Sequence, residues 1–458
     1  MPLVPEPPEA IPTYDETVRA GRASASNFER RSSSDAPAAA TARRAEHTFG
    51  DGSKEVKVLL KSHALSPGSK PLYYQNSIID GSVVLNLSRG KSPQLVRVTV
   101  LCGVERLHQA YFKSRTDPTS FDIDRYEPFW KEVVEPFVAK DASGTKHVLG
   151  AGTHILPFQF RIPRKHTPHV NIAFNNTTQE CDLPPSFVEW RNALSIQYII
   201  LVEVKFGFMK MNHDIPVLFR HVPITRPGAP PSPSIVGAYL LTSSIPTPAE
   251  EPEAFSEHSV LLLGSLFTKR FIVECKFFLI RPLAYTSGTR IPYFVHLSSP
   301  IDDENAAAST QAADLLHLSG SLILSFNRIV KMQGQVTQTY TDSLALGKTW
   351  LRKGVLEGRI LQGEIDVPKG TQADFSFPSL EIWHHIQLSV KAPGIVINTI
   401  EPPPPPESHA SRDKDPGPQA KNPAKLAIFI PVKLTNAMVA GVPDAPSYAP
   451  APGYNDEP

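Results

Sequence analysis

Apolar and polar residues alternate with a period of two along most of the chain between residues 56 and 434. In LVRVTVLCGVE the positions that share one face are Val96, Val98, Val100, Cys102 and Val104. The segments SVVLNLS, QFRIP, SIQYIILVEVKFGF and RFIVECKFFLI alternate in the same way. Because successive side chains of a strand point to opposite faces, this pattern predicts strands with one packed and one solvated face. We therefore predict an all-β protein made of antiparallel β-sandwiches.

Proline-rich segments with few apolar residues interrupt this strand pattern. Such segments cannot bury enough apolar surface to fold, so we expect them to be disordered or to act as connections. The expected order is a disordered arm at 1–53, a sandwich at 54–223, a proline-rich linker at 224–257, a second sandwich at 258–434 with a disordered insertion at 401–425, and a disordered tail at 435–458. Within the linker, one short strand is expected at Val236–Leu241. The only stretch with helical periodicity is 105–114.

The two expected sandwiches resemble each other locally. The segment YYQNSIIDGSVVLNLS in the first joins a tyrosine, a glycine turn and a strand, and YTSGTRIPYFVHLSS in the second does the same. A duplicated sandwich would explain this, but a glycine turn before a strand is common. The pattern by itself leaves duplication and chance equally open.

Composition and charge exclude several classes of protein. The 46 basic and 45 acidic residues give a net charge of +1, without the clustered basic excess of a nucleic-acid binder. The longest apolar run, SVLLLGSLF at 259–267, is too short for a membrane helix and predicts a strand. The opening MPLVPEPPEAIP lacks the regions of a signal peptide, and three scattered cysteines fit a reducing compartment. We expect a cytoplasmic protein, in which the sequons at Asn86, Asn175 and Asn176 are chance matches.

Local signatures of catalysis and metal binding are absent from the sequence. It has no G-x-S-x-G or H-E-x-x-H motif, and RGKS at 89–92 lacks the glycine spacing of a phosphate-binding loop. His384 and His385 are adjacent in a predicted strand, so we expect one buried and one exposed ring that cannot share a metal. The acidic group Asp122, Asp124 and Glu127 lacks the oxygen spacing of a calcium loop. We therefore expect no catalytic residue, metal site or cofactor, with Cys102 and Cys275 as buried apolar fillers.

Three segments carry a resemblance to a known family. In order, GTHILPFQFRIP (152–163), LPPSF (183–187) and LSIQYIILVEVKFG (194–207) resemble the N-terminal domain of arrestins. The matching residues are Gly152, Pro157, Phe158, Phe160, Pro163, Leu183, Pro184, Ser186, Phe187, Ile196 and Tyr198, with Gly81 and Gly103 upstream. KFFLIRPLAYTSGTRIPYFVHLSS, LEIWHHIQLSVKA and LAIFIPVKL resemble parts of the C-terminal domain. The resemblance covers residues 55–435 and implies two tandem immunoglobulin-like sandwiches, the arrestin fold.

Within that family the chain looks most like the alpha-arrestins, or arrestin-related trafficking adaptors. The charged core with which visual and beta arrestins read phosphorylated receptors has no recognisable counterpart here. The resemblance implies a non-catalytic adaptor that links membrane transporters or receptors to a HECT-type ubiquitin ligase with WW domains, for ubiquitination and endocytic sorting. Such a protein would be cytoplasmic and peripheral at the plasma membrane or endosomes. The alternatives are an arrestin-fold trafficking scaffold without a ligase, like the retromer-associated subunits, and an all-β hydrolase.

Alpha-arrestins typically carry P-P-x-Y motifs in unfolded tails, and this chain has four P-x-Y sequences, IPTY, KPLY, APSY and APGY. A proline-rich segment is already extended, so docking it on an aromatic groove costs little ordering entropy. The expected WW-domain-binding residues, from the three motifs near the chain ends, are Pro12, Tyr14, Pro446, Tyr448, Pro452 and Tyr454. Ile11, Ala445 or Ala451 replaces the first proline, and IPTY fits the groove best because isoleucine fills it better than alanine.

A serine cluster in the N-terminal arm suggests a second kind of site. In ERRSSSD, two arginines precede Ser32, Ser33 and Ser34, an arrangement that suits basic-directed kinases. A phosphate there would reverse the local charge and could recruit a phosphate-reading partner. These three serines are the expected phosphorylation sites.

Overall fold

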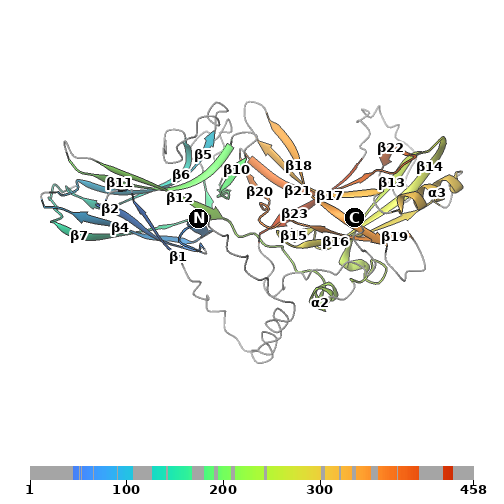
Figure 1. Ribbon diagram of the computed structural model, residues 1–458, viewed down its shortest axis with the longest axis horizontal. Coiled ribbons are helices and arrows are strands. Elements are labelled where there is room, and N and C mark those ends of the chain that lie inside the picture. The colour runs from blue at the N-terminus through green and yellow to red at the C-terminus, as the bar shows by residue number, and fades with distance from the viewer. Residues whose placement is uncertain are drawn as a thin grey trace, which may run out of the picture. The chain divides into compact units, whose positions relative to one another are not determined.

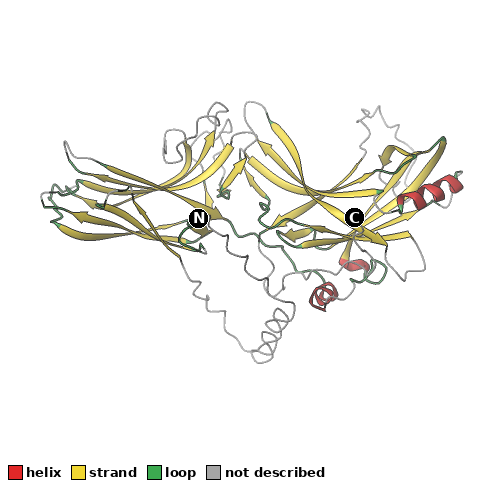
Figure 2. Ribbon diagram, viewed as in Figure 1, coloured by secondary structure: helices red, strands yellow, loops and turns green. Residues whose placement is uncertain are grey.

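The computed structural model consists mostly of β-strands (Figures 1 and 2). It describes residues 45–436 apart from 51, 53, 65, 90, 107–125, 141–142, 168–179, 190–193, 208–211, 242–244, 301–304, 319–320, 333–336, 352–358, 379 and 402–426. Of the described residues, 63% lie in strands and 7% in helices. The predicted β-rich class is therefore confirmed. No helix within these ranges has the length and apolar character that crossing a bilayer requires.

The first half of the described chain forms two main sheets over one hydrophobic cluster. Its strands are β1 (Ala45–Gly50), β2 (Val56–Ser62), β3 (Leu72–Tyr74), β4 (Ile78–Leu87), β5 (Leu95–Arg106), β6 (Tyr126–Val138), β7 (Gly152–Arg161), β8 (Lys165–His166), β9 (Cys181–Asp182), β10 (Phe187–Glu189), β11 (Leu194–Lys205) and β12 (His213–Val222). One sheet has the order β1-β2-β4-β7 and the other β3-β12-β11-β5-β6, with β10 on β11. The cluster includes Val58, Val83, Val100 and Ile200, so the alternating residues face inward as predicted.

The second half forms a single sheet of eleven strands. The elements are α2 (Pro233–Leu241), the 3-10 helix η3 (Pro252–Ala254), β13 (Phe255–Leu266), β14 (Lys269–Ile280), β15 (Ala284–Thr286), β16 (Arg290–Ser298), α3 (Ala306–Leu316), β17 (Leu322–Met332), β18 (Gln338–Leu351), β19 (Arg359–Asp366), β20 (Phe375–Phe377), β21 (Leu380–Val390), β22 (Ile395–Glu401) and β23 (Ala427–Thr435). The order is β15-β23-β21-β17-β18-β19-β16-β14-β13-β22, with β20 on β21. Strand β18 pairs with both β17 and β19, so the strands on its two sides form one continuous curled sheet. SVLLLGSLF lies in β13, as predicted, except for its last residue, Phe267.

The sheets are mixed, so the prediction of wholly antiparallel sheets is wrong at two pairs. Strand β3 runs parallel to β12, and β15 runs parallel to β23. In each case a three-residue strand near the start of a half meets the last strand of that half, far away in sequence. No hairpin turn constrains such a pair, so its direction depends only on how the chain returns to the sheet edge.

The two halves repeat the same strand order. Phe187 of β10 is opposite Ile196 of β11, and Phe375 of β20 is opposite Ile382 of β21. Counted from one edge of the sheet, the strand order β3-β12-β11-β5-β6 of the first half corresponds to β15-β23-β21-β17-β18 of the second. Similar backbone hydrogen bonds also occur: Ser186 N–H donates to the His221 carbonyl at 2.9 Å, and Asp374 N–H donates to the Leu434 carbonyl at 3.0 Å. These correspondences favour the duplication that the sequence pattern left open.

Three elements differ from the sequence prediction. The arm predicted to be disordered to residue 53 contains strand β1, which pairs with β2 along its whole length. The strand expected at Val236–Leu241 is instead part of helix α2, because Pro233 begins the helix and Ile235 and Ala238 pack together on Phe255 and Phe294. Helix α3 is absent from the prediction. Its buried residues Ala308, Ser309, Ala312, Ala313 and Leu316 have the helical spacing that could have revealed it.

Candidate functional site

The residues predicted from sequence to recruit partners lie outside the described part of the chain. They are Pro12, Tyr14, Ser32, Ser33, Ser34, Pro446, Tyr448, Pro452 and Tyr454. The same holds for residues 402–425 of the predicted insertion and for residues 437–458 of the tail. The fourth P-x-Y sequence, KPLY, is described, and its Tyr73 has no exposed surface within β3. Tyr73 is therefore a core residue and not a docking residue.

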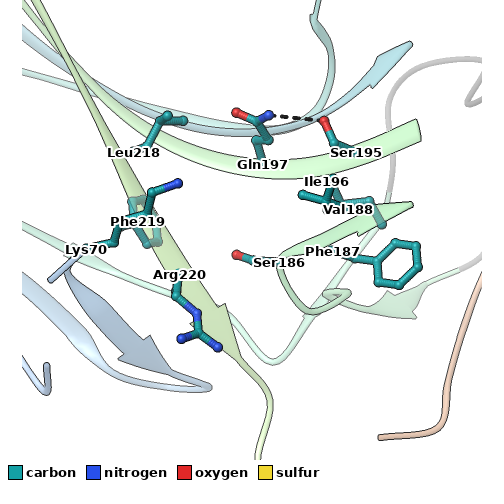
Figure 3. Close-up of a pocket in the computed structure, with 10 residues that line it drawn as sticks. All are labelled: Lys70, Ser186, Phe187, Val188, Ser195, Ile196, Gln197, Leu218, Phe219 and Arg220. Atoms are coloured by element: carbon teal, nitrogen blue, oxygen red, sulfur yellow. Dashed lines mark hydrogen bonds between the residues drawn. The ribbon is translucent and has the colours of Figure 1, made fainter. Parts of the chain in front are cut away.

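A pocket of about 310 Å³ opens in the first half beside the LPPSF segment (Figure 3). Its lining residues are Lys70, Ser186, Phe187, Val188, Ser195, Ile196, Gln197, Leu218, Phe219 and Arg220. They come from the segment before β3, the segment before β10, and strands β10, β11 and β12. Ser186, Phe187 and Ile196 belong to the family-like segments, but no pattern in the sequence predicts that a pocket lies beside them.

The pocket exists because β11 changes its pairing partner. Tyr198–Val204 of β11 pairs with β12, whereas Leu194–Ile196 pairs with β10. Strand β12 separates from β11 after Phe219 and pairs with β3 instead. Gln197 lies between the two pairings, and its side chain donates a hydrogen bond to Ser195 Oγ at 3.1 Å (Figure 3). The space between the diverging strands is the pocket.

The chemistry of the lining suits binding. Lys70 and Arg220 are exposed, and within the described ranges neither has an acidic partner. The lining also offers two hydroxyl groups, one amide and the apolar side chains of Phe187, Val188 and Leu218. It contains no histidine, cysteine or carboxylate that could act as a general acid or base near neutral pH. A ligand there would meet an apolar wall and hydrogen-bonding groups beside two positive charges.

Buried hydrogen bonds fix the LPPSF segment against β11 and β12. Tyr198 Oη donates to the Pro184 carbonyl at 2.5 Å, and His221 Nδ1 donates to the same carbonyl at 3.0 Å. Ser186 Oγ accepts from the His221 backbone N–H at 2.8 Å. Because Tyr198 and His221 are fully buried, these bonds would be costly to break without a replacement. The motif serine and tyrosine thus hold one wall of the pocket in place.

Burial keeps the ionisable groups behind this wall neutral. Burial lowers the pKa of His221 to about 4, and the hydrogen bond to the Pro184 carbonyl opposes this only in part. His221 Nε2 has no hydrogen-bond partner among the described residues, so a proton added there would be buried without an acceptor. Burial also raises the pKa of Tyr198 and of Cys102 well above their usual ranges. These side chains are structural supports at neutral pH.

The lowered pKa of His221 predicts acid sensitivity. An unfolded chain binds a proton at this histidine near pH 6.5, while the folded chain binds it only near pH 4. The folded state therefore has its full free energy of unfolding when His221 is neutral, above pH 6.5, and loses part of it as the pH falls towards 4. Between pH 7 and pH 5 the loss should be about 2 kcal/mol. Urea unfolding of the protein and of a His221→Phe variant across this range measures it.

The test compares how steeply the free energy of unfolding changes with pH in the two proteins, and not its value at any one pH. His221→Phe loses the bond to the Pro184 carbonyl and will be less stable at every pH. Its stability should nevertheless fall less steeply with acid than that of the unchanged protein. Equal slopes for the two proteins would show that His221 takes up its proton normally in the folded state.

Both adjacent histidines of β21 are buried, which corrects the expectation that one would be exposed. His384 Nδ1 lies 2.6 Å from Asp374 Oδ1, and His385 Nε2 lies 3.2 Å from Asn327 Nδ2. The two rings have different partners, as expected for opposite faces of a strand. His385 is buried among side chains of the two neighbouring strands, with Asn327 on β17 and the Phe429 ring, 5.2 Å away, on β23.

No metal site is evident in the described ranges, where three or more histidine, cysteine, aspartate or glutamate side chains never gather closely enough to hold an ion. Asp122 and Asp124 lie outside these ranges, and so does the side chain of Glu127, whose backbone is part of β6. Cys102 and Cys275 are buried in the two hydrophobic clusters, as predicted. Burial raises the pKa of the Cys275 thiol to about 12, so it stays protonated.

Comparison with known proteins identifies no family. No protein-family model matches the chain, and no curated protein is significantly similar to it. A functional assignment therefore depends on the residues and geometry described above.

Proposed function

We propose that this protein is a non-catalytic adaptor of the alpha-arrestin type, which links membrane-protein cargo to a WW-domain ubiquitin ligase of the HECT type. In this proposal each half is an immunoglobulin-like sandwich of the arrestin kind, and the protein works in the cytoplasm at the plasma membrane or endosomes. The observation that carries the proposal is the repeated strand order of the two β-rich halves, with the family-like LPPSF segment anchored against β11 and β12.

The pocket supports a binding role for the first half. Its lining combines apolar side chains with hydroxyls, an amide and two cations, a composition that recognises a ligand without transforming it. A cytoplasmic segment of a membrane transporter or receptor would supply a side chain to this pocket. The rest of such a segment could bind along a sheet edge, where unpaired backbone groups can accept another strand.

The P-x-Y sequences support the ligase role. Three of the four, IPTY, APSY and APGY, lie near the two chain ends, and a ligase with several WW domains can bind more than one at once. Individually weak contacts then gain from effective concentration. A ligase held close to the bound cargo would ubiquitinate it faster, and sorting into endocytic vesicles would follow.

The test is binding of the full chain to a tandem WW-domain protein. The triple variant Tyr14→Ala, Tyr448→Ala and Tyr454→Ala should bind at least about tenfold more weakly, because each tyrosine fills a pocket beside the proline groove. Fluorescence anisotropy or calorimetry measures the change. A matched control is Pro443→Ala with Pro450→Ala, since neither residue is the proline of a P-x-Y sequence.

The outcome separates the adaptor from its closest alternative. If the triple variant binds the WW array as tightly as the unchanged chain, these motifs do not recruit a ligase. An arrestin-fold scaffold without a ligase would then be the better description. Pocket variants such as Arg220→Ser should weaken cargo binding and leave WW binding unaffected.

A further inference from the structure

Four neighbouring strands of the second half, in the order β23-β21-β17-β18, present a face that points away from the hydrophobic core (Figure 1). Phe326, Ile386 and Ile430 lie in the core cluster, so the alternate residues of these strands point outward. The eighteen outward residues are Ala427, Phe429, Pro431 and Lys433 of β23, Glu381, Trp383, His385, Gln387 and Ser389 of β21, Ile323, Ser325, Asn327, Ile329 and Lys331 of β17, and Thr339, Thr341, Ser343 and Leu346 of β18. We call this set the neutral face.

Large apolar side chains lie open on the neutral face. Phe429 is 50% exposed and Leu346 63%. The register places them at the two ends of one row across the four strands, with Gln387 and Ser325 between them. Trp383 lies on the same face and is half-buried. Aromatic residues of this kind are enriched where one protein contacts another.

The neutral face carries little charge. Its charged side chains are Lys331, Glu381 and Lys433, and Lys331 pairs with Glu381 at 3.0 Å. The outward side of β5 and β6 in the first half differs, since Arg97 and Glu135 form an ion pair there at 2.8 Å. Depletion of charge together with aromatic side chains is the composition of the central part of a protein interface.

The polar groups at the centre of the neutral face already bind one another. Asn327 Nδ2 donates to Ser325 Oγ at 3.1 Å and to Gln387 Oε1 at 3.0 Å. It also lies 3.2 Å from His385 Nε2. Burial lowers the pKa of His385, so its ring is neutral near pH 7. Because these side chains are fixed by bonds within the face, a partner can cover them at little cost in ordering or in lost hydrogen bonds to water.

The neutral face has the size of one side of a protein interface. Strands lie about 4.8 Å apart and outward residues recur about every 6.8 Å along a strand, so each occupies about 33 Å² of the sheet plane. Eighteen such residues span about 600 Å², and their accessible area is larger because the side chains project from the plane. A standard stable interface takes about 800 Å² from each partner.

We propose that the neutral face is the interface through which two copies of this chain form a symmetric dimer. A twofold axis brings the same surface of both copies together, and two sheets can pack face to face about 10 Å apart. The contact uses neither the pocket nor the P-x-Y sequences. It therefore goes beyond the adaptor function and stands or falls independently of it.

A second copy is the partner that the chemistry of the face fits. Hydroxyl and amide side chains both donate and accept hydrogen bonds, so a set of them can complement itself. The face has nearly balanced charge, so two copies do not repel each other, whereas a strongly acidic or basic partner would meet few opposite charges. A dimer would also present each P-x-Y sequence twice to a ligase with several WW domains.

The test is analytical ultracentrifugation of the full chain over a range of concentrations. The unchanged chain should sediment as a dimer at about 10 μM. Phe429→Lys and Leu346→Lys should each raise the dissociation constant of the dimer at least about tenfold, because a symmetric dimer would bury each new charge twice. Ile155→Lys is the matched control, since Ile155 is 64% exposed on β7 of the first half. All three positions are exposed, so each variant should melt within about 3 °C of the unchanged chain.

The results decide the proposal in either direction. A dimer that dissociates in the Phe429 and Leu346 variants and persists in Ile155→Lys supports it. A chain that stays monomeric up to about 100 μM overturns it. A dimer that both variants leave intact also overturns it, because the interface would then lie elsewhere. Binding of a single WW domain should be the same for all these variants, so this test and that of the adaptor function can fail separately.

Discussion

Replacing Gly363 with alanine should lower the melting temperature of the second half by about 6–12 °C. A Cβ atom at this position would collide with the Tyr293 ring and would lie 2.5 Å from the Lys348 carbonyl oxygen. Gly363 is directly opposite Tyr293 in the β16–β19 pair, and Tyr293 is fully buried. Overpacking of this kind costs about 3 kcal/mol when backbone is involved. In a domain of this size, that loss corresponds to the expected shift.

Tyr293 cannot move aside easily, which is why a large effect is expected. Its hydroxyl lies 2.6 Å from Thr349 Oγ1 and donates to the Lys348 carbonyl at 3.1 Å. Moving the ring would break these bonds inside the core. Differential scanning calorimetry measures the shift, with Gly237→Ala as the control. Gly237 lies in α2 with open space around the position that a Cβ atom would take, so alanine there should be neutral or stabilising by up to about 1 kcal/mol.

Replacing Asp374 with alanine should destabilise the second half by about 3 kcal/mol. Asp374 Oδ1 accepts hydrogen bonds from His384 Nδ1 at 2.6 Å and from the Leu434 backbone N–H at 3.1 Å. His384 is fully buried, and the Asp374 side chain is 19% exposed. Removal of the carboxylate leaves two buried donors without an acceptor, and losses of this type are among the largest for single substitutions. Chemical denaturation monitored by tryptophan fluorescence measures the change.

Two further variants distinguish the loss of a buried hydrogen-bond acceptor from the loss of a negative charge. Asp374→Asn keeps an oxygen in place for the Leu434 N–H, so it should cost about 1 kcal/mol. Asp366→Ala removes a carboxylate that is 46% exposed and pairs with Arg290 at 2.9 Å. Because Asp366 is half exposed and Arg290 keeps its ion pair with Glu364, this loss should cost less than about 1 kcal/mol. If Asp374→Ala were as mild as Asp366→Ala, the buried bonds to His384 and Leu434 would contribute little.

The sequence by itself determined the β-rich class and the buried face of each long strand. Alternation along LVRVTVLCGVE and RFIVECKFFLI correctly placed Val100, Cys102 and Cys275 inside, because the faces of a strand are fixed by its own period of two. The same local logic placed SVLLLGSLF in a strand. The prediction missed α3, whose buried residues recur at helical spacing but are mostly alanines, which carry a weak apolar signal.

Only the tertiary structure decided which strands pair and which side chains lie beside one another on each face. The parallel pairs β3–β12 and β15–β23 join residues that are far apart in the chain, so no local pattern specifies them. The burial of both His384 and His385 depends on residues from other segments on each face. The pocket beside Ser186 likewise appears only where β11 exchanges β12 for β10. The sequence of a strand determines which side chains share a face, because that depends only on its own period of two. Which strands lie beside it depends on the path of the whole chain between strands that are far apart in sequence.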